Sequence, residues 1–183
     1  MAGKPLFILN NTIHELPQGD DWRGEVIAMN FFMDKEQWMV TANNKLYHAK
    51  DRDYRFSYWG NLSTYGSGAY YSRAWTVDGK TYICPSAARD IIELDSAGHQ
   101  RVISLEPFEG QPGAFAGSWT YGPYLLLIPF RYPAIIRYDT RSGETAYLRG
   151  INGFFVNQIQ SEWLIGGSCI WQGKLVIGSP AVS

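Results

Sequence analysis

The sequence predicts an all-β protein built from repeated four-stranded antiparallel units. One residue pattern occurs twice without a gap: the segments 75–95 and 119–139 share Trp, Pro, Ile-Ile and Asp at equivalent positions, 44 residues apart. Each copy consists of short apolar runs separated by turn-forming residues. No segment carries apolar residues at helical spacing over three turns. These observations favour strands over helices along the chain.

The first copy contains four expected strands, A to D in chain order. The runs "RAWTV" and "KTYIC" are joined by Asp78-Gly79, a dipeptide typical of tight hairpin turns with glycine at positive φ. "DIIELD" and "QRVISLE" follow, each after a short turn. The second copy repeats the order with "GSWTY", "YLLLIP", "AIIRYD" and "ETAYLRG". Each copy is therefore expected to form an antiparallel meander.

A single four-stranded meander cannot bury its apolar residues alone. Repeats of about 40–50 residues with four strands each are typical of a β-propeller, whose blades pack face to face around an axis. We therefore expect one propeller domain over residues 1–183. Its expected blades cover residues 25–60, 70–106 and 114–150, with a split blade formed by 164–183 and 5–17.

Two local expectations belong to these assignments. In the first blade, Asn43-Asn44 is expected to form a type I′ turn between strands B and C, because Asn tolerates positive φ. In the C-terminal segment, "SCIWQGKLVIG" resembles an A–B hairpin in which Trp171 takes the place of Trp75.

The chain thus begins with an expected C–D hairpin and ends with an expected A–B hairpin. Three arrangements remain open: closure of one four-bladed ring, a fragment of a larger propeller, or a homodimer that completes a larger, eight-bladed ring. An open arc would leave a strand edge and a blade face uncovered. We favour association or truncation over a closed four-bladed monomer. Closure predicts pairing between residues 5–9 and 173–178, within one chain or between two.

The segments "IIELDSAGHQ" and "IIRYDTRSGE" resemble the C–D corner of propeller repeats in the kelch and quinoprotein-like superfamilies. This resemblance implies that Asp95 and Asp139 cap the turn from strand C into strand D. No family motif is complete. The Gly-Gly pair that kelch repeats place after strand B is replaced by Pro-Ser and Pro-Phe, and the WD signature is absent. The resemblance therefore implies a fold and no functional residues.

Composition excludes several classes of partner. The chain has 16 Lys and Arg against 17 Asp and Glu, and this balance predicts no binding to nucleic acid or to an anionic membrane. Two cysteines, Cys84 and Cys169, do not make a disulfide framework, and both are expected to be buried free thiols. Since neither a signal peptide nor a membrane-spanning apolar run is seen, we expect a soluble, cytoplasmic protein.

The sequence predicts no catalytic residue, no metal site and no cofactor. His14, His48 and His99 are far apart in sequence and lack the spacing of metal ligands. The glycine-rich "YGSGAYYS" is not followed by Lys-Ser/Thr, so it does not indicate a phosphate loop. No ordered triad or nucleophile elbow is present. A site assembled from several blades would nevertheless escape detection in one sequence.

The aromatic residues divide into two groups. Trp75 and Trp119 recur at one repeat position, which indicates packing between blades. Other aromatic and arginine residues fall in D–A and B–C connections, which emerge on the same propeller face at the mouth of the channel. Loops on a rigid scaffold commonly carry function. The expected ligand-binding residues are Trp59, Tyr70, Tyr71, Arg73, Arg89, Arg131 and Tyr132.

Two functional hypotheses follow. The first is a non-catalytic recognition propeller that binds a glycan, a peptide or a protein partner at this face. The second is a propeller enzyme of glycoside-processing or lyase type. Paired carboxylates at the channel mouth would favour the enzyme, and an aromatic-lined mouth without them would favour binding.

Overall fold

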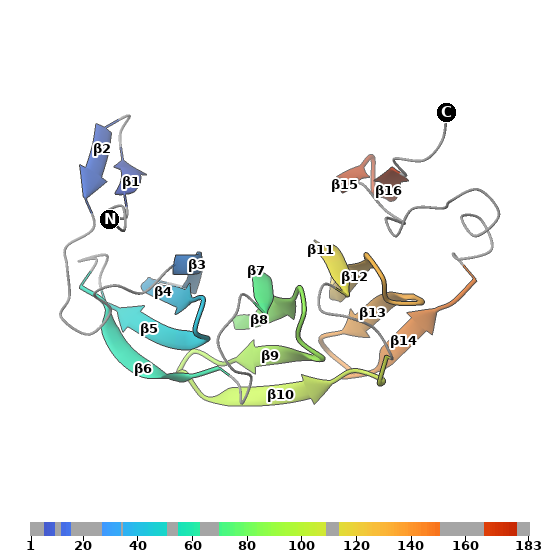
Figure 1. Ribbon diagram of the computed structural model, residues 1–183, viewed down its shortest axis with the longest axis horizontal. Coiled ribbons are helices and arrows are strands. Elements are labelled where there is room, and N and C mark those ends of the chain that lie inside the picture. The colour runs from blue at the N-terminus through green and yellow to red at the C-terminus, as the bar shows by residue number, and fades with distance from the viewer. Residues whose placement is uncertain are drawn as a thin grey trace. The chain divides into compact units, whose positions relative to one another are not determined.

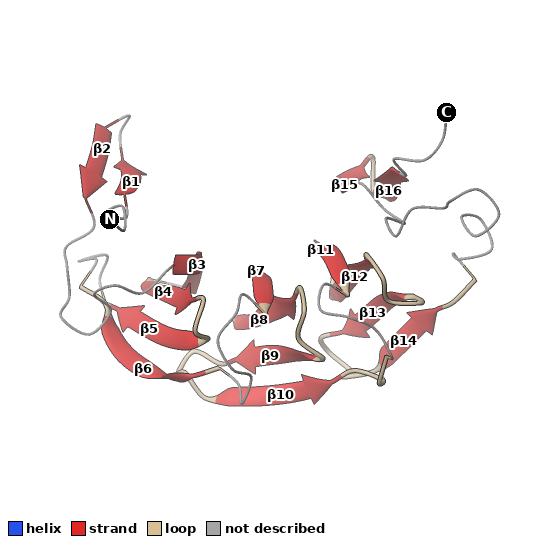
Figure 2. Cartoon of the chain, viewed as in Figure 1, coloured by secondary structure: helices blue, strands red, loops and turns tan. Residues whose placement is uncertain are grey.

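The computed structural model describes residues 6–9, 12–15, 27–33, 35–50, 55–62, 70–108, 114–150 and 167–178. Every regular element in these ranges is a β-strand (Figure 2). The predicted all-β class is therefore confirmed. No helix within the described ranges is long and apolar enough to cross a membrane. The chain divides into two compact units, Met1–Tyr70 and Tyr71–Ser183, each of which is considered by itself.

The first unit contains a two-stranded sheet, β1-β2, and a four-stranded antiparallel sheet in the order β3-β4-β5-β6, which we call the first blade (Figure 1). The strands are β1 (Leu6–Leu9), β2 (Thr12–Glu15), β3 (Ile27–Met33), β4 (Glu36–Thr41), β5 (Lys45–Ala49) and β6 (Ser57–Asn61). The core of this blade is a cluster of the buried side chains Met39, Tyr47, Ala49 and Phe56. Strands that are consecutive in the chain are neighbours in the sheet, so the sheet is a simple meander.

The turn between β4 and β5 differs from the expected type I′ turn. Only Asn44 has a positive φ, 59°, and its N–H donates to the Thr41 carbonyl at 2.9 Å. A type I′ turn requires positive φ at both central residues. The prediction for Asn43-Asn44 was therefore wrong. The positive φ falls on one asparagine at the entry to β5, a conformation that Asn adopts more readily than most residues.

The second unit contains two four-stranded sheets and a hairpin. The second blade has the order β7-β8-β9-β10, the third blade has the order β11-β12-β13-β14, and β15-β16 form the C-terminal hairpin. The strands are β7 (Tyr71–Val77), β8 (Lys80–Pro85), β9 (Asp90–Leu94), β10 (Gln100–Ser104), β11 (Phe115–Tyr121), β12 (Tyr124–Pro129), β13 (Ile135–Asp139), β14 (Thr145–Leu148), β15 (Gly167–Trp171) and β16 (Lys174–Gly178).

The turns of the second unit follow the sequence signals. Asp78 and Gly79 have φ values of 49° and 77°, as a type I′ turn between β7 and β8 requires. The Asp95 carboxylate accepts hydrogen bonds from the N–H groups of Ala97 and His99, both at 2.9 Å. Asp139 likewise accepts hydrogen bonds from the two residues Arg141 and Ser142. The predicted capping of the C–D corners is confirmed.

The C-terminal hairpin corrects one alignment. Trp171 is opposite Lys174, directly before the turn, whereas Trp75 is opposite Tyr82, two residues earlier in its strand. Counted from the turn, Cys169 is therefore the equivalent of Trp75. Trp171 is 61% exposed and was wrongly placed by the sequence pattern. The error arose because register depends on the position of the turn, which aromatic spacing alone does not fix.

The second and third blades share one core. Many of its members come from strands B and C of both blades, among them Tyr82 and Ile91 from the second and Leu127, Ile136 and Tyr138 from the third. The rings of Tyr82 and Tyr138 have centroids 5.9 Å apart. Face-to-face packing of four-stranded blades is the expected propeller arrangement. The N-terminal and C-terminal hairpins each form a separate two-stranded sheet, and the pairing of residues 5–9 with 173–178 stays a prediction.

Candidate ligand-binding site

The A strands of the second unit are linked by a repeated hydrogen bond. β11 packs against both β7 and β15 (Figure 1). The indole Nε1–H of Trp75 donates to Ser118 Oγ at 2.8 Å, and that of Trp119 donates to Ser168 Oγ at 2.9 Å. Each tryptophan therefore reaches the next A strand along the chain. This agrees with the predicted packing role and adds a polar contact that was not predicted.

Ser118 is fully buried between these strands, which makes its hydrogen bond important for stability. A buried hydroxyl without a partner would cost about 1–3 kcal/mol. The two indole rings are also near each other, with centroids 5.9 Å apart and planes inclined by 36°. We call the two hydrogen bonds, Trp75 to Ser118 and Trp119 to Ser168, the Trp–Ser ladder. This ladder fixes the orientation of Trp119, whose ring remains partly exposed.

Arg73 lies beside this ladder. Its guanidinium carbon is 5.4 Å from the centroid of the Trp119 ring, within the range of a cation–π contact. The side chain is exposed, and it forms no ion pair with any carboxylate among residues that the structure describes. Arg73 therefore presents a cation held against an aromatic surface. The sequence identified Arg73, but it assigned Trp119 to packing alone.

Cys84 is opposite Arg73 on the neighbouring strand, and it is fully buried. Burial raises the pKa of the Cys84 thiol to about 12, although a hydrogen bond with Ser118 and the charge of Arg73 oppose the shift. The thiol is thus protonated near neutral pH and is a poor nucleophile. Cys84 is a buried free thiol as predicted, but Cys169 in β15 is exposed, so the prediction for Cys169 was wrong.

Two of the tyrosines that were predicted to bind a ligand are buried and have a structural role. Tyr71 is 2% exposed, and its hydroxyl donates to Asp90 Oδ1 at 2.6 Å. Tyr132 is 4% exposed, stacks on Phe115 with centroids 5.1 Å apart, and donates to the Glu106 carbonyl at 3.0 Å. Burial raises the pKa of Tyr132 to about 12. In this structure both side chains hold the connections around them in place.

The predicted arginines lie in the B–C turns of the second and third blades. Arg89 is exposed, and the Arg131 guanidinium is 5.6 Å from the centroid of the Phe130 ring. Both turns are tied to the start of β11: Phe115 N–H donates to the Ser86 carbonyl, and the Ala114 carbonyl accepts from three residues of the second turn. The structure therefore brings both turns to the end of the unit at which β7 begins.

The remaining two candidates belong to the first unit. Trp59 is 46% exposed, and its ring contacts Trp38 and His48 with centroids 5.4 and 5.2 Å away. Tyr70 is half-buried at the end of that unit. These two side chains belong to a different compact unit from the arginines, and a common site for all seven residues remains a prediction.

In the parts of the chain that the structure describes, no group of three or more His, Cys, Asp or Glu side chains could hold a metal ion. The chemistry offered near Arg73 is that of a cation beside the indole rings of Trp119 and Trp75. Such a set suits recognition of a carboxylate or another planar anion.

No protein-family model matches the chain, and no curated protein matches it in sequence. The structure is similar to that of a catalytically inactive virginiamycin B lyase from Staphylococcus aureus with quinupristin, at 16% identity and a TM-score of 0.52. That match covers 76% of this chain and 45% of the lyase chain.

A second similar structure is the extracellular domain of BT4673 from B. thetaiotaomicron, described as a one-component system, at 10% identity and a TM-score of 0.51. This match covers 85% of the chain and 19% of the other protein. The chain thus spans less than half the length of either protein. Likeness at such identity shows the fold alone, and the fold is that of a β-propeller.

Proposed function

We propose that this protein is a non-catalytic recognition propeller whose second and third blades bind a carboxylate-bearing peptide segment of a partner protein. The observation that carries this proposal is Arg73, an exposed cation that is stacked on Trp119 and has no carboxylate partner in the described part of the chain. A guanidinium presents a planar fork of N–H donors that matches a carboxylate. Stacking orients that fork before the ligand arrives, which lowers the entropic cost of binding.

The two B–C turns support the same site. Arg89 and Arg131 add positive charge at the end of the unit where β7 begins, and Tyr71 and Tyr132 stabilise the connections there. Clustered cations raise the association rate of an acidic ligand through long-range attraction. The expected ligand is therefore an acidic peptide, with the first carboxylate on Arg73 and others near the two turns.

A glycan that contains uronic acids is the other source of a carboxylate. The experiment is isothermal titration of the full chain with an acidic peptide of alternating Glu and Ala, and separately with an oligogalacturonate of equal charge. Saturable binding of the peptide is expected, and Arg73→Gln should weaken it by about tenfold or more. Binding of the oligogalacturonate alone would replace the peptide with a glycan.

Arg141 provides a matched control. It is an exposed arginine of the third blade whose guanidinium pairs with Asp78, at the opposite end of the strands from the B–C turns. Arg141→Gln should change the dissociation constant by less than about twofold, since exposed pairs contribute little. Equal weakening by both substitutions, or stronger binding of a neutral peptide than of the acidic one, would contradict the proposal.

The alternative is a propeller enzyme of glycoside-processing or lyase type. It requires a general acid or base beside the bound ligand. Of the ionisable groups next to Arg73, the Cys84 thiol is protonated at neutral pH because burial raises its pKa to about 12. Turnover of an oligogalacturonate, measured as new unsaturated or reducing ends and abolished by Arg73→Gln, would favour the enzyme.

A further inference from the structure

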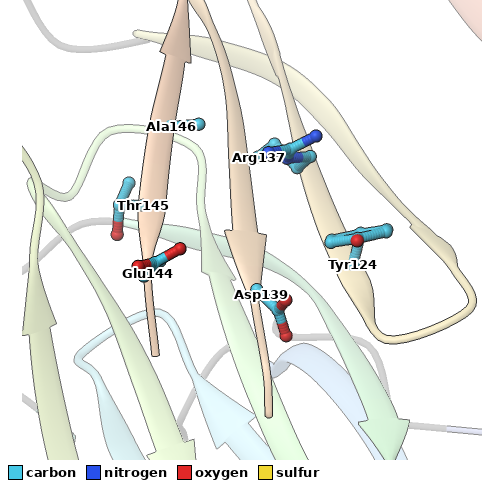
Figure 3. Close-up of a pocket in the computed structure, with 6 residues that line it drawn as sticks. All are labelled: Tyr124, Arg137, Asp139, Glu144, Thr145 and Ala146. Atoms are coloured by element: carbon cyan, nitrogen blue, oxygen red, sulfur yellow. The ribbon is translucent and has the colours of Figure 1, made fainter. Parts of the chain in front are cut away.

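A hollow on the third blade is lined by charges of both signs. Its volume is about 390 Å³, within the range of about 300–1,000 Å³ that is usual for small-molecule sites. Figure 3 shows the lining side chains, which come from β12, β13, β14 and the turn between the last two strands: Tyr124, Arg137, Asp139, Glu144, Thr145 and Ala146. One sheet therefore positions all of them.

The cationic part of the hollow is Arg137. Its guanidinium carbon is 5.0 Å from the centroid of the Tyr124 ring, a cation–π contact that orients the side chain. Arg137 is exposed, and it has no hydrogen bond or ion pair to any residue in the described ranges. Because side chains alternate along a strand, Arg137 and Asp139 share the face of the hollow, while Ile136 and Tyr138 lie in the core shared with the second blade.

The anionic part is a pair of carboxylates. The Asp139 N–H donates to the Glu144 carbonyl at 2.9 Å, so these residues are opposite each other where β13 ends and β14 begins. Hydrogen bonds from the backbone N–H groups of Arg141 and Ser142 lower the pKa of the Asp139 carboxyl, which is therefore ionised near neutral pH. Neither carboxylate forms an ion pair with a residue that the structure describes. Like charges at opposed positions are destabilising, so a cation between them is favourable.

The second blade satisfies the equivalent of Arg137 from within the chain. Glu93 occupies this position and Lys80 occupies that of Tyr124, each 44 residues earlier. Lys80 Nζ donates to the Glu93 carboxylate at 2.9 Å. In the third blade an aromatic ring replaces the lysine and a guanidinium replaces the carboxylate. The arginine is therefore oriented by its neighbour but is not neutralised by it.

The C–D turns of the two blades differ in the same way. In the second blade, the Asp95 N–H donates to the His99 carbonyl, and His99 Nδ1 is 3.0 Å from Asp95 Oδ2. The residue opposite the capping aspartate is thus a histidine in the second blade, whereas in the third blade it is Glu144, which repeats the charge of Asp139. Within the described ranges, the charges of the hollow lack the partners that the second blade supplies, and they are available to a ligand.

We infer that the hollow binds a free basic α-amino acid, with its carboxylate on Arg137 and its ammonium groups at Asp139 and Glu144. The hollow presents one cation and two carboxylates, whereas lysine presents one carboxylate and two ammonium groups, so the charges are complementary. Positions two residues apart on a strand are separated by about 7 Å, which the flexible methylene stem of lysine spans. A guanidinium pairs with a carboxylate through two parallel hydrogen bonds. This inference does not depend on the ligand proposed for Arg73.

The first test is isothermal titration of the full chain with L-lysine and three analogues, each of which lacks one charged group. Saturable binding of one lysine per chain is expected. Norleucine lacks the side-chain ammonium and cadaverine lacks the carboxylate, so each should bind at least about tenfold more weakly, because it leaves a charge of the site unpaired. Absence of saturable lysine binding, or equal affinity for norleucine, would overturn the inference.

The third analogue, Nα-acetyl-L-lysine, distinguishes a free amino acid from the C-terminal lysine of a peptide. It keeps the carboxylate and the side-chain ammonium but has an amide in place of the α-ammonium. We expect it to bind about fivefold more weakly than lysine, or weaker still. Equal or tighter binding would overturn the assignment to a free amino acid in favour of a peptide terminus.

Substitutions in the hollow should act on different groups of the ligand. Arg137→Gln should weaken lysine binding by about tenfold or more but should not weaken the binding of cadaverine, which has no carboxylate. Glu144→His introduces the residue type found opposite Asp95 in the second blade, and it should weaken the binding of both ligands by about tenfold or more.

Arg149→Gln is the matched control. Arg149 also lies over a tyrosine of this blade, with its guanidinium carbon 5.5 Å from the centroid of the Tyr147 ring, but it does not line the hollow. This substitution should change the dissociation constant of lysine by less than about twofold. Equal effects of Arg137→Gln and Arg149→Gln on lysine binding would overturn the assignment of Arg137 as the group that binds the carboxylate.

Discussion

The second and third blades carry opposite charges at the same place in strand C. In the second blade, Glu93 is 6% exposed and is held by Lys80 and Arg101. In the third blade, Arg137 is exposed and stacks on Tyr124. The repeat fixes where the side chain stands, but the neighbouring blade decides whether it is buried. The same position is therefore structural in one blade and available for recognition in the next.

The two sites also differ in how their charge is stabilised. Burial alone would raise the pKa of the Glu93 carboxyl, but hydrogen bonds from Lys80 and Arg101 outweigh it, and the pKa lies below its usual value. The site in the second blade is thus a satisfied network, whose members are costly to remove singly. Arg137 has no such network within the described ranges, so its removal should cost little.

The largest expected effect on stability comes from Tyr138, the residue of the third blade that packs against the charged network of the second blade. Tyr138 is 1% exposed, packs on Tyr82 and accepts a hydrogen bond from Arg101. Tyr138→Ala should lower the free energy of unfolding by about 3–5 kcal/mol, as large aromatic truncations in cores do. Tyr124→Ala, on the opposite face of the same blade, should cost less than about 1.5 kcal/mol. Urea denaturation measures both, and equal losses would refute the distinction between the two faces.

The next effect concerns the charge of the second blade. Glu93→Gln removes a nearly buried acceptor of two charged donors and should cost about 1–3 kcal/mol. Both donors are half-exposed, with side-chain exposures of 47% for Lys80 and 57% for Arg101, which keeps the loss below that of a fully buried pair. Arg137→Gln in the third blade should cost less than about 0.5 kcal/mol. Similar losses at the two positions would mean that burial does not govern them.

Acid titration separates these positions further. The folded pKa of Glu93 is lowered, so its stabilising contribution is present above its unfolded pKa, about 4.3, and is lost as the pH falls through the folded value. The stability difference between the wild type and Glu93→Gln should therefore shrink below about pH 4.3. The difference for Arg137→Gln should stay constant in this range, because no carboxylate is paired with it in the described ranges. A difference for Glu93→Gln that does not depend on pH would contradict the network.

The sequence predicted features that depend on neighbouring residues along the chain. The four-stranded units and the caps at Asp95 and Asp139 follow from local turn chemistry, and the structure contains them. Trp171 was misplaced because strand register is set by the Gln172-Gly173 turn, whose φ values of 48° and 71° the aromatic pattern does not reveal.

The site was less predictable because it depends on contacts between blades. Arg73 was identified from its position near a connection, but its stacking on Trp119 joins strands of two blades. Tyr71 and Tyr132 were selected as aromatic loop residues, and their burial depends on Asp90, Phe115 and other groups that are distant in sequence. A single sequence does not give these distances, since they are set by packing between repeats.

The smallest expected effect tests the hydrogen-bond ladder between blades. Trp75→Phe keeps an aromatic ring but removes the Nε1–H donor to Ser118, and should cost about 0.5–1.5 kcal/mol. Since Phe is also smaller than Trp, a double-mutant cycle with Ser118→Ala is needed to isolate the bond. The equivalent cycle of Trp119→Phe with Ser168→Ala should give a smaller coupling, because Ser168 is partly exposed and water can replace its partner. Additive losses in both cycles would show that the two Trp–Ser hydrogen bonds do not contribute to stability. A larger coupling at Ser168 than at Ser118 would show that the C-terminal hairpin is held at least as firmly as a whole blade, and would contradict the expectation that burial strengthens the hydrogen bond.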